Sequence, residues 1–565
     1  MHFNLVKASN RRYLEELKNR GHEMKPVYDA VNIMQETEWV INKPVYEVIS
    51  KLIEIDDGTG NLPTNPQTIP LPIKEPDVEN NDKTSPTYKE NLVKWKRQAS
   101  LVYKDRAKSK SKYIQVRQIL TEAELLLDRS FFYPYQLDFR GRIYPKPAML
   151  SPQGADYSRA LIKFKYGKQM KENNSFDDFA IAGAGLFGEV DKEDIQTRLD
   201  WVKERLDLFI SYAKEPLINT DWSKADKPFC FLAWCFELKD FAETGYDATF
   251  ITTLPIQSDC SNSGLQHYSA MMRDPVGGKA TNLIPSNKPE DVYRIVAEKV
   301  IEKLKTKTDP MAKLWLDYGV DRKLCKKPVM CLPYSLTQYS CRQYLQDHVE
   351  KEKIEKSRPH YFGEDLFKAT NWLTPIVWES INEVIVGAKE IMSFLKTVSR
   401  LVASENLPVT WTTPKPLNFP VQMMCYKKES KRVKTKMGDS IIKLSIQSDT
   451  EEIDKRKTAQ SICPNLIHSL DASVLQLAVI KAKEKGVTNF SLIHDSFGCV
   501  APDVAKLSEA IREAFCEVYE QDVLTNWAME MKQMLSDKNA KKFPHIPERG
   551  ELDLSLVKQS IFFCV

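Results

Sequence analysis

The chain has 565 residues, which is too many for one simple hydrophobic core, so we expect roughly two to four subdomains. Hydrophobic residues make up 42% of the chain and charged residues 28%, as in ordinary globular proteins. No apolar run approaches the roughly 18 residues that a membrane helix needs, and the first residues lack the apolar core of a signal peptide. The composition therefore predicts a cytoplasmic protein that is neither secreted nor bound to a membrane.

The charge balance and the cysteines carry little functional information by themselves. A net charge of +4 is weak support for nucleic-acid binding, so the local distribution of charge matters more. The eleven cysteines form none of the paired CxxC sets of a zinc site. We expect them to be reduced thiols, mostly small buried residues.

The first 129 residues read as helices interrupted by a linker. Apolar residues at helical spacing predict helices over residues 10–55, and the proline-rich residues 57–88 predict a loop. Residues 88–129 predict a basic helix in which lysines and arginines alternate with Trp95, Tyr103 and Tyr113. Such a helix can follow a phosphate backbone, but the residues alone favour a solvated helical face.

Three segments further along carry side chains of the kinds that bind ions or take part in catalysis. In Leu254–His267, an apolar strand ends at Asp259, and an exposed carboxylate there can bind a hard cation or simply cap the following helix. Residues 286–304 predict a helix with Pro289, Glu290 and Asp291 in its first turn. In Asp321–Tyr334, helical spacing puts Arg322, Lys326, Met330 and Tyr334 on one stripe, although Pro328 and Pro333 disturb a regular helix.

The C-terminal part predicts two hairpins and two helices. Residues 421–447 read as a long basic hairpin with a turn at Met437-Gly438-Asp439. Helices are predicted over residues 470–485 and 502–520, with a strand–turn–strand over 490–500 between them. The turn of that unit holds His494-Asp495, which is either a plain turn or a carboxylate on a buried scaffold. If Asp495 met Asp259, the two carboxylates would repel each other and need divalent cations. Sequence spacing alone does not show whether they meet.

Taken together, these segments resemble the single-subunit RNA polymerases of bacteriophages, mitochondria and chloroplasts. Asp259 with its Ser/Gly turn resembles motif A of that family, Arg322–Tyr334 resembles motif B, and His494-Asp495-Ser496 resembles motif C. Asp138-Phe139-Arg140-Gly141-Arg142 and Pro464-Asn465-Leu466-Ile467-His468 also match in order. The resemblance runs from about residue 27 to the C-terminus.

The resemblance implies DNA-templated RNA synthesis from ribonucleoside triphosphates with two Mg²⁺ ions. It implies that Asp259, Asp495 and the carbonyl of Cys260 hold the metals. Lys326 and Tyr334 would act at the catalytic centre, and Arg322 with Lys326 would bind the triphosphate. The remaining substrate-binding residues would be Arg142 beside the hybrid, and Tyr293, Tyr334 and His468 near the ribose.

The resemblance also implies a right-hand architecture of the α+β class, mostly helical. We expect a remnant of an N-terminal domain in residues 1–40, a thumb in 41–128 and the palm in 129–287. Fingers would span 288–468 and include the specificity hairpin 421–447, and residues 469–565 would complete the palm and add a C-terminal foot. The hairpin would contact promoter DNA through basic side chains, namely Lys427, Lys428, Lys431, Arg432, Lys434 and Lys436.

The chain departs from the family pattern in three places. Relatives often have Lys-Ile-His-Gly where this chain has Ala180-Ile181-Ala182-Gly183, so one phosphate-contacting lysine is missing. Ser335 follows Tyr334 where glycine is usual. Most of the usual N-terminal domain is missing, and the sequence leaves open whether the chain is a fragment, whether a separate chain supplies that domain, or whether the protein works without it.

Two other functions remain as alternatives. A family A-like DNA polymerase or a primase is disfavoured because such DNA polymerases usually have His-Asp-Glu where this chain has His494-Asp495-Ser496. A non-catalytic DNA-binding subunit is disfavoured because binding alone does not need both carboxylates in the path of an anionic ligand.

Overall fold

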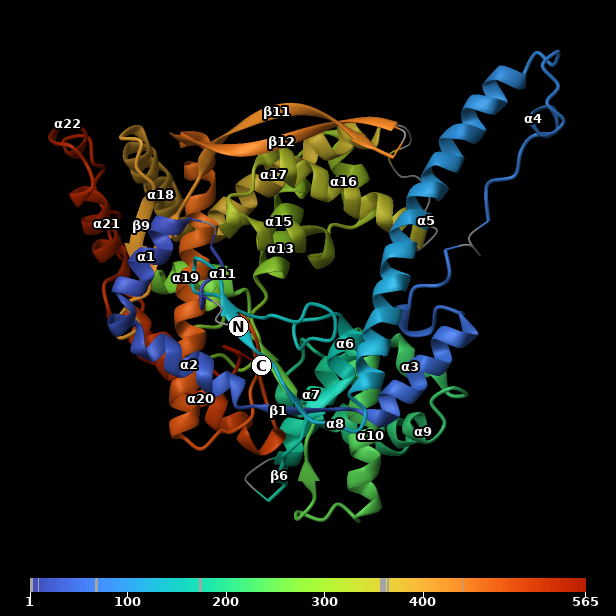
Figure 1. Cartoon of the computed structure of the whole chain (residues 1–565), viewed down its shortest axis with the longest axis horizontal. Coiled ribbons are helices and arrows are strands. Elements are labelled where there is room, and N and C mark those ends of the chain that lie inside the picture. The colour runs from blue at the N-terminus through green and yellow to red at the C-terminus, as the bar shows by residue number, and fades with distance from the viewer. Residues whose placement is uncertain are drawn as a thin grey trace.

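The computed structural model describes residues 4–8, 10–66, 70–171, 175–355, 362, 365–438 and 440–564. The described residues are mostly helical, with small sheets between the helices, which confirms the α+β prediction (Figure 1). A hydrophobic core runs through the body of the molecule and includes the fully buried Trp39, Trp222, Trp234 and Trp315.

The N-terminal segment contains the predicted helices and one strand that we did not predict. Its elements are α1 (Arg11–Asn19), η1 (Gly21–Met24), α2 (Lys25–Gln35), β1 (Glu38–Ile41) and α3 (Lys43–Ile55). Strand β1 pairs antiparallel with β2 (Phe131–Phe132) and β5 (Ile162–Phe164). Trp39 and Ile41 point into the core, and this alternation over only four residues was hidden among apolar residues that also fit a helical period.

The predicted basic helix is α5 (Tyr88–Leu125), which projects away from the body of the molecule (Figure 1). Only Ala99, Val116, Ile119 and Ala123 are buried along it. The preceding linker, with η2 (Thr59–Asn61) and α4 (Pro76–Glu79), returns along its outer end. There Trp95 donates a hydrogen bond of 2.8 Å from Nε1 to the carbonyl of Pro72.

A mostly helical layer follows in the sequence. It consists of β6 (Lys168–Gln169), α7 (Ser175–Phe187), α8 (Ile195–Lys203), α9 (Leu206–Lys214), η3 (Thr220–Lys224), α10 (Pro228–Glu243) and β7 (Ile251–Thr252). Helices α7 and α10 are joined by aromatic packing, since the rings of Phe179 and Trp234 stack at 5.0 Å. Trp234 also donates from Nε1 to the Phe179 carbonyl.

Three strands far apart in the sequence form the central sheet, in the order β13-β14-β8. Their bounds are β8 (Ile256–Asp259), β13 (Ser491–Ile493) and β14 (Ser496–Cys499), so the predicted strand–turn–strand is confirmed. Gly498 lets the strands approach closely, because a Cβ there would lie 2.4 Å from Nε2 of Gln257. Nearby, β3 (Tyr135–Leu137) pairs with β4 (Ile143–Pro145), and α6 (Asp156–Ala160) follows.

The next helices extend from the sheet to the upper part of the molecule in Figure 1. They are α11 (Ser263–Met272), α12 (Pro275–Ala280), α13 (Val292–Lys305), α14 (Pro310–Tyr318), α15 (Arg322–Cys331), η4 (Leu332–Tyr334), α16 (Gln338–Glu355), α17 (Leu366–Val384) and α18 (Val386–Ser404). Our prediction for α13 was wrong at its start. Asp291 is the N-cap and accepts from the backbone N–H groups of Tyr293 and Arg294, so Pro289 and Glu290 precede the helix.

The long hairpin is confirmed, with different limits from those predicted. Residues 421–423 belong to β10 (Pro420–Met423), which pairs with β9 (Val409–Thr412). The hairpin itself consists of β11 (Tyr426–Met437) and β12 (Ser440–Ile453), which lie across α16 and α17 in Figure 1. The predicted turn includes Asp439, which lies outside the described residues.

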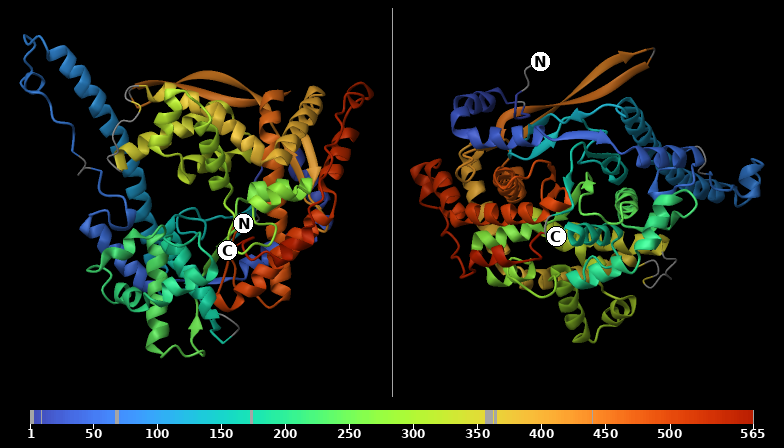
Figure 2. Two further views of the ribbon diagram at one scale, coloured as in Figure 1. Left: turned by 180° about the vertical axis from the view of Figure 1, so that it is seen from behind. Right: turned by 90° about the horizontal axis from the view of Figure 1, so that it is seen from below.

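The C-terminal part is built on α19 (Lys455–Glu484), which is longer than the predicted 470–485 and continues through Pro464. Among the described helices, α19 alone is long and apolar enough to cross a membrane, but 83% of its most apolar window is buried, as in a core helix. It is followed by η5 (Ala501–Asp503), α20 (Val504–Glu520), α21 (Val523–Gln533), α22 (Asp537–Ala540) and η6 (Leu554–Gln559). Figure 2 shows the C-terminus ending in the middle of the molecule, near the central sheet.

The expectation that every cysteine is a free thiol was wrong for two of them. Cys260 and Cys564 form a disulfide across 304 residues of sequence, and their backbones form an isolated antiparallel bridge. The other nine cysteines are free, and seven of these are buried. The pair was not recognisable from spacing because it depends on the C-terminal segment lying beside the end of β8.

Candidate active site

The structure brings Asp259 and Asp495 together at one edge of the central sheet. Asp259 pairs with Ser496 across β8 and β14, and the N–H of Cys260 donates to the Asp495 carbonyl at 3.1 Å. Asp495 follows His494 in the two-residue turn between β13 and β14, and His494 has a left-handed φ of 55°. The sheet register therefore makes the two carboxylates neighbours.

The electrostatics of this pair are those of like charges held close together. Burial raises the pKa of Asp495, and the charge of Asp259 raises it further, against the opposing charge of Arg142. Asp259 is 58% exposed, but it lies in the wall of a cavity, and the surrounding protein still raises its pKa through burial. The positive charges of Lys227 and Arg159, together with hydrogen bonds from Ser496 and Lys227, outweigh that effect, and the net pKa of Asp259 is lowered.

A cavity of about 720 Å³ lies in front of Asp259. Its walls include Cys260, Tyr293, Arg322 and Lys326, all of which the sequence predicted as site residues. Asp495, Tyr334, His468 and Arg142 are not in its lining. The cavity therefore contains only part of the candidate site.

Helix α15 supplies two cations to the cavity, one helical turn apart. Arg322 forms an ion pair with Asp291, and its guanidinium lies 5.2 Å from the ring centroid of Tyr293. Lys326 is exposed to the cavity, and burial, followed by the charges of Arg322 and Lys192, lowers its pKa. The predicted spacing of Arg322, Lys326 and Met330 falls within α15, but Tyr334 lies in η4 after the helix and outside the cavity wall.

Tyr334 packs between the segments that resemble motifs A and B. A Cβ on Gly264 would lie 3.0 Å from Cβ of Pro333 and 3.2 Å from the Tyr334 hydroxyl, so glycine permits this close approach. The rings of Tyr334 and His468 lie 5.1 Å apart. Burial raises the pKa of Tyr334, and the charges of Asp471 and Asp495 add to that effect. The phenol is therefore neutral and close to both parts of the site.

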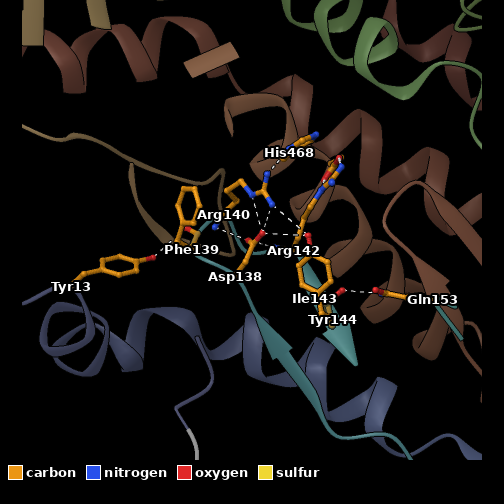
Figure 3. A network of polar contacts seen from close by, with 10 residues as sticks. Tyr13, Asp138, Phe139, Arg140, Arg142, Ile143, Tyr144, Gln153 and His468 are labelled. Atoms are coloured by element: carbon orange, nitrogen blue, oxygen red, sulfur yellow. Dashed lines mark hydrogen bonds and ion pairs between the residues drawn. The ribbon is translucent and has the colours of Figure 1, made fainter. Parts of the chain in front are cut away.

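A polar network around Asp138 connects the β3–β4 hairpin with α19 (Figure 3). Arg140 donates from Nε to Asp138 at 2.9 Å and from Nη1 to Nδ1 of His468 at 2.7 Å. Because a guanidinium only donates, Nδ1 of His468 is the acceptor, and the ring proton is on Nε2. Burial and the charges of Arg142 and Arg140 lower the pKa of His468 to about 2, so the ring stays neutral.

Arg142 is held by Asp471, one turn after His468 on α19. The two side chains are only 13% and 4% exposed. Burial raises the pKa of Asp471, and Arg142 opposes that effect. We regard Asp471 as ionised, because two hydrogen bonds from an always-charged guanidinium favour the carboxylate.

The C-terminal residues form hydrogen bonds with the segment that follows Asp259. Ser261 donates from its backbone N–H to the Phe563 carbonyl and from Oγ to the Phe562 carbonyl. Gln266 donates to the Phe563 carbonyl at 3.1 Å. Together with the disulfide, these contacts join the C-terminus to the turn after Asp259.

The hairpin residues predicted to contact DNA fall into two groups, and none lies in the cavity wall. Lys427 pairs with Glu452 at 2.6 Å, Lys431 lies 3.9 Å from Glu429, and Lys428 is opposite Asp449 in the ladder. Arg432, Lys434 and Lys436 alternate along one face towards the tip, and none forms an ion pair with a described carboxylate. The outer part of the hairpin is therefore its more positive part.

Sequence reasoning missed Lys227, Asp471 and the role of Asp138. Lys227 directly precedes the Pro228-Phe229-Cys230 segment, and its ammonium lies 3.4 Å from Oδ2 of Asp259. Asp471 is three residues after His468, a helical spacing that the sequence shows. Its partner Arg142, however, is 329 residues away in the chain, so the ion pair was not recognisable. Within the described residues, no cluster of three or more His, Cys, Asp or Glu side chains is arranged to hold a metal. Protein carboxylates would thus supply only part of a metal's ligands.

Comparisons with known proteins agree on one family. The family model described as DNA-dependent RNA polymerase matches residues 169–542. The chain is 33% identical to the "DNA-directed RNA polymerase" of Enterobacteria phage T3 and to the "T7 RNA polymerase" of Escherichia phage T7. Each alignment covers 95% of this chain and 64% of the phage protein.

A plant protein gives the same result over a smaller share of its length. The "DNA-directed RNA polymerase 2, chloroplastic/mitochondrial" of Arabidopsis thaliana is 32% identical over 96% of this chain and 52% of its own. The chain thus spans between about half and two thirds of the length of these relatives. The match to the family model and these identities show that the chain belongs to the DNA-dependent RNA polymerase family.

Proposed function

We propose that this chain catalyses DNA-templated synthesis of RNA from ribonucleoside triphosphates. The observation that carries the proposal is the meeting of Asp259, at the end of β8, with Asp495, in the turn before β14, 236 residues apart in sequence and beside a cavity lined by cations. The names of the relatives, which are DNA-directed RNA polymerases, support the same activity.

The residues present fit divalent cations at this sheet edge. Burial raises the pKa of Asp495, and repulsion from Asp259 raises it further. A divalent cation held by both carboxylates would remove that repulsion. Asp259, Asp495 and the carbonyl of Cys260 would hold two Mg²⁺ ions. When bound, the ions would activate the 3′-hydroxyl of the RNA and neutralise the leaving pyrophosphate.

Arg322 and Lys326 would bind the triphosphate of the incoming nucleotide. They lie one turn apart on α15 and both line the cavity that Asp259 enters. A guanidinium offers paired donors to phosphate oxygens, and a lysine adds a compact point charge. Asp291 and Tyr293 hold Arg322 in place before a nucleotide arrives.

Tyr334, His468 and Tyr293 would recognise the ribose. His468 keeps its proton on Nε2, because Arg140 occupies Nδ1, so it can donate a hydrogen bond to a hydroxyl at any ordinary pH. A site built to pair with a 2′-hydroxyl rejects a substrate that lacks it. Arg142, fixed by Asp471, would face the RNA–DNA hybrid.

Replacing Tyr334 with phenylalanine tests this assignment. Tyr334→Phe removes only the hydroxyl, and we expect discrimination against deoxynucleotides to fall about ten-fold, the cost of one hydrogen bond in a buried site. The ratio of kcat/KM for a ribonucleotide and its deoxy analogue measures this. Unchanged discrimination would remove Tyr334 from the ribose site.

We also propose a right-hand division of the chain. Residues 41–128, with the projecting α5, would form the thumb, and 129–287 with 469–565 would form the palm. Residues 288–468 would form the fingers and carry the hairpin that contacts promoter DNA. Residues 1–40 would be part of an N-terminal domain. Helix α19 is continuous through residue 468, so fingers and palm would share one rigid helix.

A primed RNA–DNA scaffold tests the proposed activity most simply, because it needs no promoter opening. With Mg²⁺ and ribonucleotides, we expect template-dependent extension that stops when EDTA is added. Extension with deoxynucleotides in preference to ribonucleotides would favour a DNA polymerase. Binding of the scaffold without any extension would favour a DNA-binding subunit.

A further inference from the structure

One cation beside the candidate metal ligands has no role in the function proposed so far. Lys227 is positioned by its backbone, since its N–H donates to the carbonyl of Leu186 at 3.1 Å and that of Asp226 donates to Phe187 at 3.0 Å. Both acceptors lie in the last turn of α7, and α10 starts at the next residue, Pro228. Lys227 is therefore fixed at the junction of two packed helices, directly at the cavity wall.

The wall that α7 contributes to this cavity carries no cation. It consists of Asp178, Ile181, Ala182, Gly185 and Leu186. Position 180, where the family pattern often has lysine, is a fully buried alanine. Any positive charge on this side of the cavity must therefore come from a neighbouring segment, and Lys227 is hydrogen-bonded to the end of α7 itself.

Lys227 differs from other cations of the cavity in its partner. Arg322 pairs with Asp291, and Lys192 pairs with Asp191 at 2.9 Å. Lys227 instead pairs with Asp259, the carboxylate assigned to the metals, and its side chain is 34% exposed. A divalent cation that bound Asp259 would compete with this ammonium group for the carboxylate, because both are cations and Lys227 already contacts Oδ2. The polyphosphate that arrives with the metals is the anion that can accept it.

We propose that Lys227 exchanges partners during the reaction cycle. In the empty site its ammonium neutralises Asp259, and in the loaded site it binds the terminal phosphates of the nucleotide and then the pyrophosphate. The flexible four-carbon stem of lysine permits such a movement without a change in the backbone. This assignment rests on the proposed function. Under it, Lys227, the residue directly before α10, provides the positive charge that position 180 lacks.

The exchange predicts two effects of opposite sign for Lys227→Gln. Without nucleotide, Mn²⁺ binding measured by the EPR signal of the free ion should become about two- to five-fold tighter, because an ion pair no longer competes. With saturating Mg²⁺, the affinity for inorganic pyrophosphate measured by calorimetry should fall about ten-fold, because a charge-assisted contact is lost. Lys227→Arg, which keeps the charge, should bind pyrophosphate like the wild type.

Lys224→Gln is the matched control, because Lys224 lies three residues earlier, is 68% exposed and pairs with Asp221 outside the cavity. It should change neither affinity. If Lys227→Gln leaves either the Mn²⁺ or the pyrophosphate affinity unchanged, the exchange is wrong. Neither measurement requires RNA synthesis, so failure of the wild type to extend a primed scaffold would count against the proposed function separately.

Discussion

The central sheet and the long hairpin are both antiparallel and both carry charged side chains, but they hold their charges in opposite ways. At the sheet, Asp259 and Asp495 are exposed, but the neighbouring Arg142 and Asp471 are almost fully buried and hold each other in place. Along β11 and β12, nearly every residue is exposed, and the strands pair mainly with each other. One region is arranged to keep positions fixed and the other to present a surface.

This difference has an energetic consequence. Enclosed charges interact strongly and are costly to leave unpaired, whereas exposed pairs contribute little because water screens them. Substitutions at the sheet should therefore alter catalysis or folding, and substitutions on the hairpin should alter DNA binding and its salt dependence. Four predictions test this contrast.

The largest effect is expected from the two carboxylates. Asp259→Asn and Asp495→Asn remove metal-binding charge with little change in shape, so extension of a primed scaffold should fall by about a thousand-fold or more. Scaffold binding, measured by gel shift, should persist. Asp221→Asn is a close control, because Asp221 is also 58% exposed and paired with a lysine. Extension by either site variant at the control's rate would contradict the metal assignment.

The next largest effect is on stability. Asp471→Ala leaves Arg142 charged and buried without its partner, which should lower the free energy of unfolding by about 3–5 kcal/mol. Asp449→Ala on the exposed hairpin should change it by less than about 0.5 kcal/mol. Urea unfolding of both variants measures the difference. Equal stabilities would mean that the enclosed network does not differ from the exposed one.

The hairpin should show its effect in the salt dependence of DNA binding. If Arg432, Lys434 and Lys436 each neutralise a phosphate, replacing all three with glutamine should reduce the slope of log K against log salt by about 2.7. Lys427→Gln should reduce the slope less than any one of them, because Lys427 already pairs with Glu452. Fluorescence anisotropy with duplex promoter DNA at several salt concentrations provides the slopes. An unchanged slope for the triple variant would remove this face from the DNA interface.

The smallest effect is a pH-dependent one at Asp178 in the cavity wall. Burial, with a further contribution from Asp177, raises its pKa from 3.8 to about 6. The folded state therefore holds this proton more tightly than the unfolded state, so stability is lost as pH rises from about 4 through about 6. Asp178→Asn should then be more stable than the wild type by about 1 kcal/mol at pH 8, after allowance for partial exposure. Unfolding measured at several pH values should show the advantage shrinking towards pH 4, and a constant difference would contradict this account.

Local features of the site were largely predictable from sequence. Asp259 at a strand end, Asp495 in a tight turn, and the spacing of Arg322 and Lys326 follow from local periodicity and turn chemistry. The hairpin strands and α5 were predictable for the same reason. Such features depend on residues close together in the chain.

The remaining features depend on tertiary contacts. The pairing of β8 with β14, the bond between Arg142 and Asp471, and the position of Lys227 each join segments far apart in sequence. Pro464 lies inside α19 although proline usually ends a helix, because burial of both flanks outweighs the lost hydrogen bond. Cys260 and Cys564 meet only because the C-terminus returns to the sheet.

The central claim is that Asp259 and Asp495 share divalent cations. Crystals of the protein with an RNA–DNA scaffold, a non-hydrolysable nucleotide and Mn²⁺ would test it directly through anomalous scattering. We predict two manganese peaks, at least one of which contacts both carboxylates. Manganese bound elsewhere, with neither aspartate as a ligand, would contradict the claim.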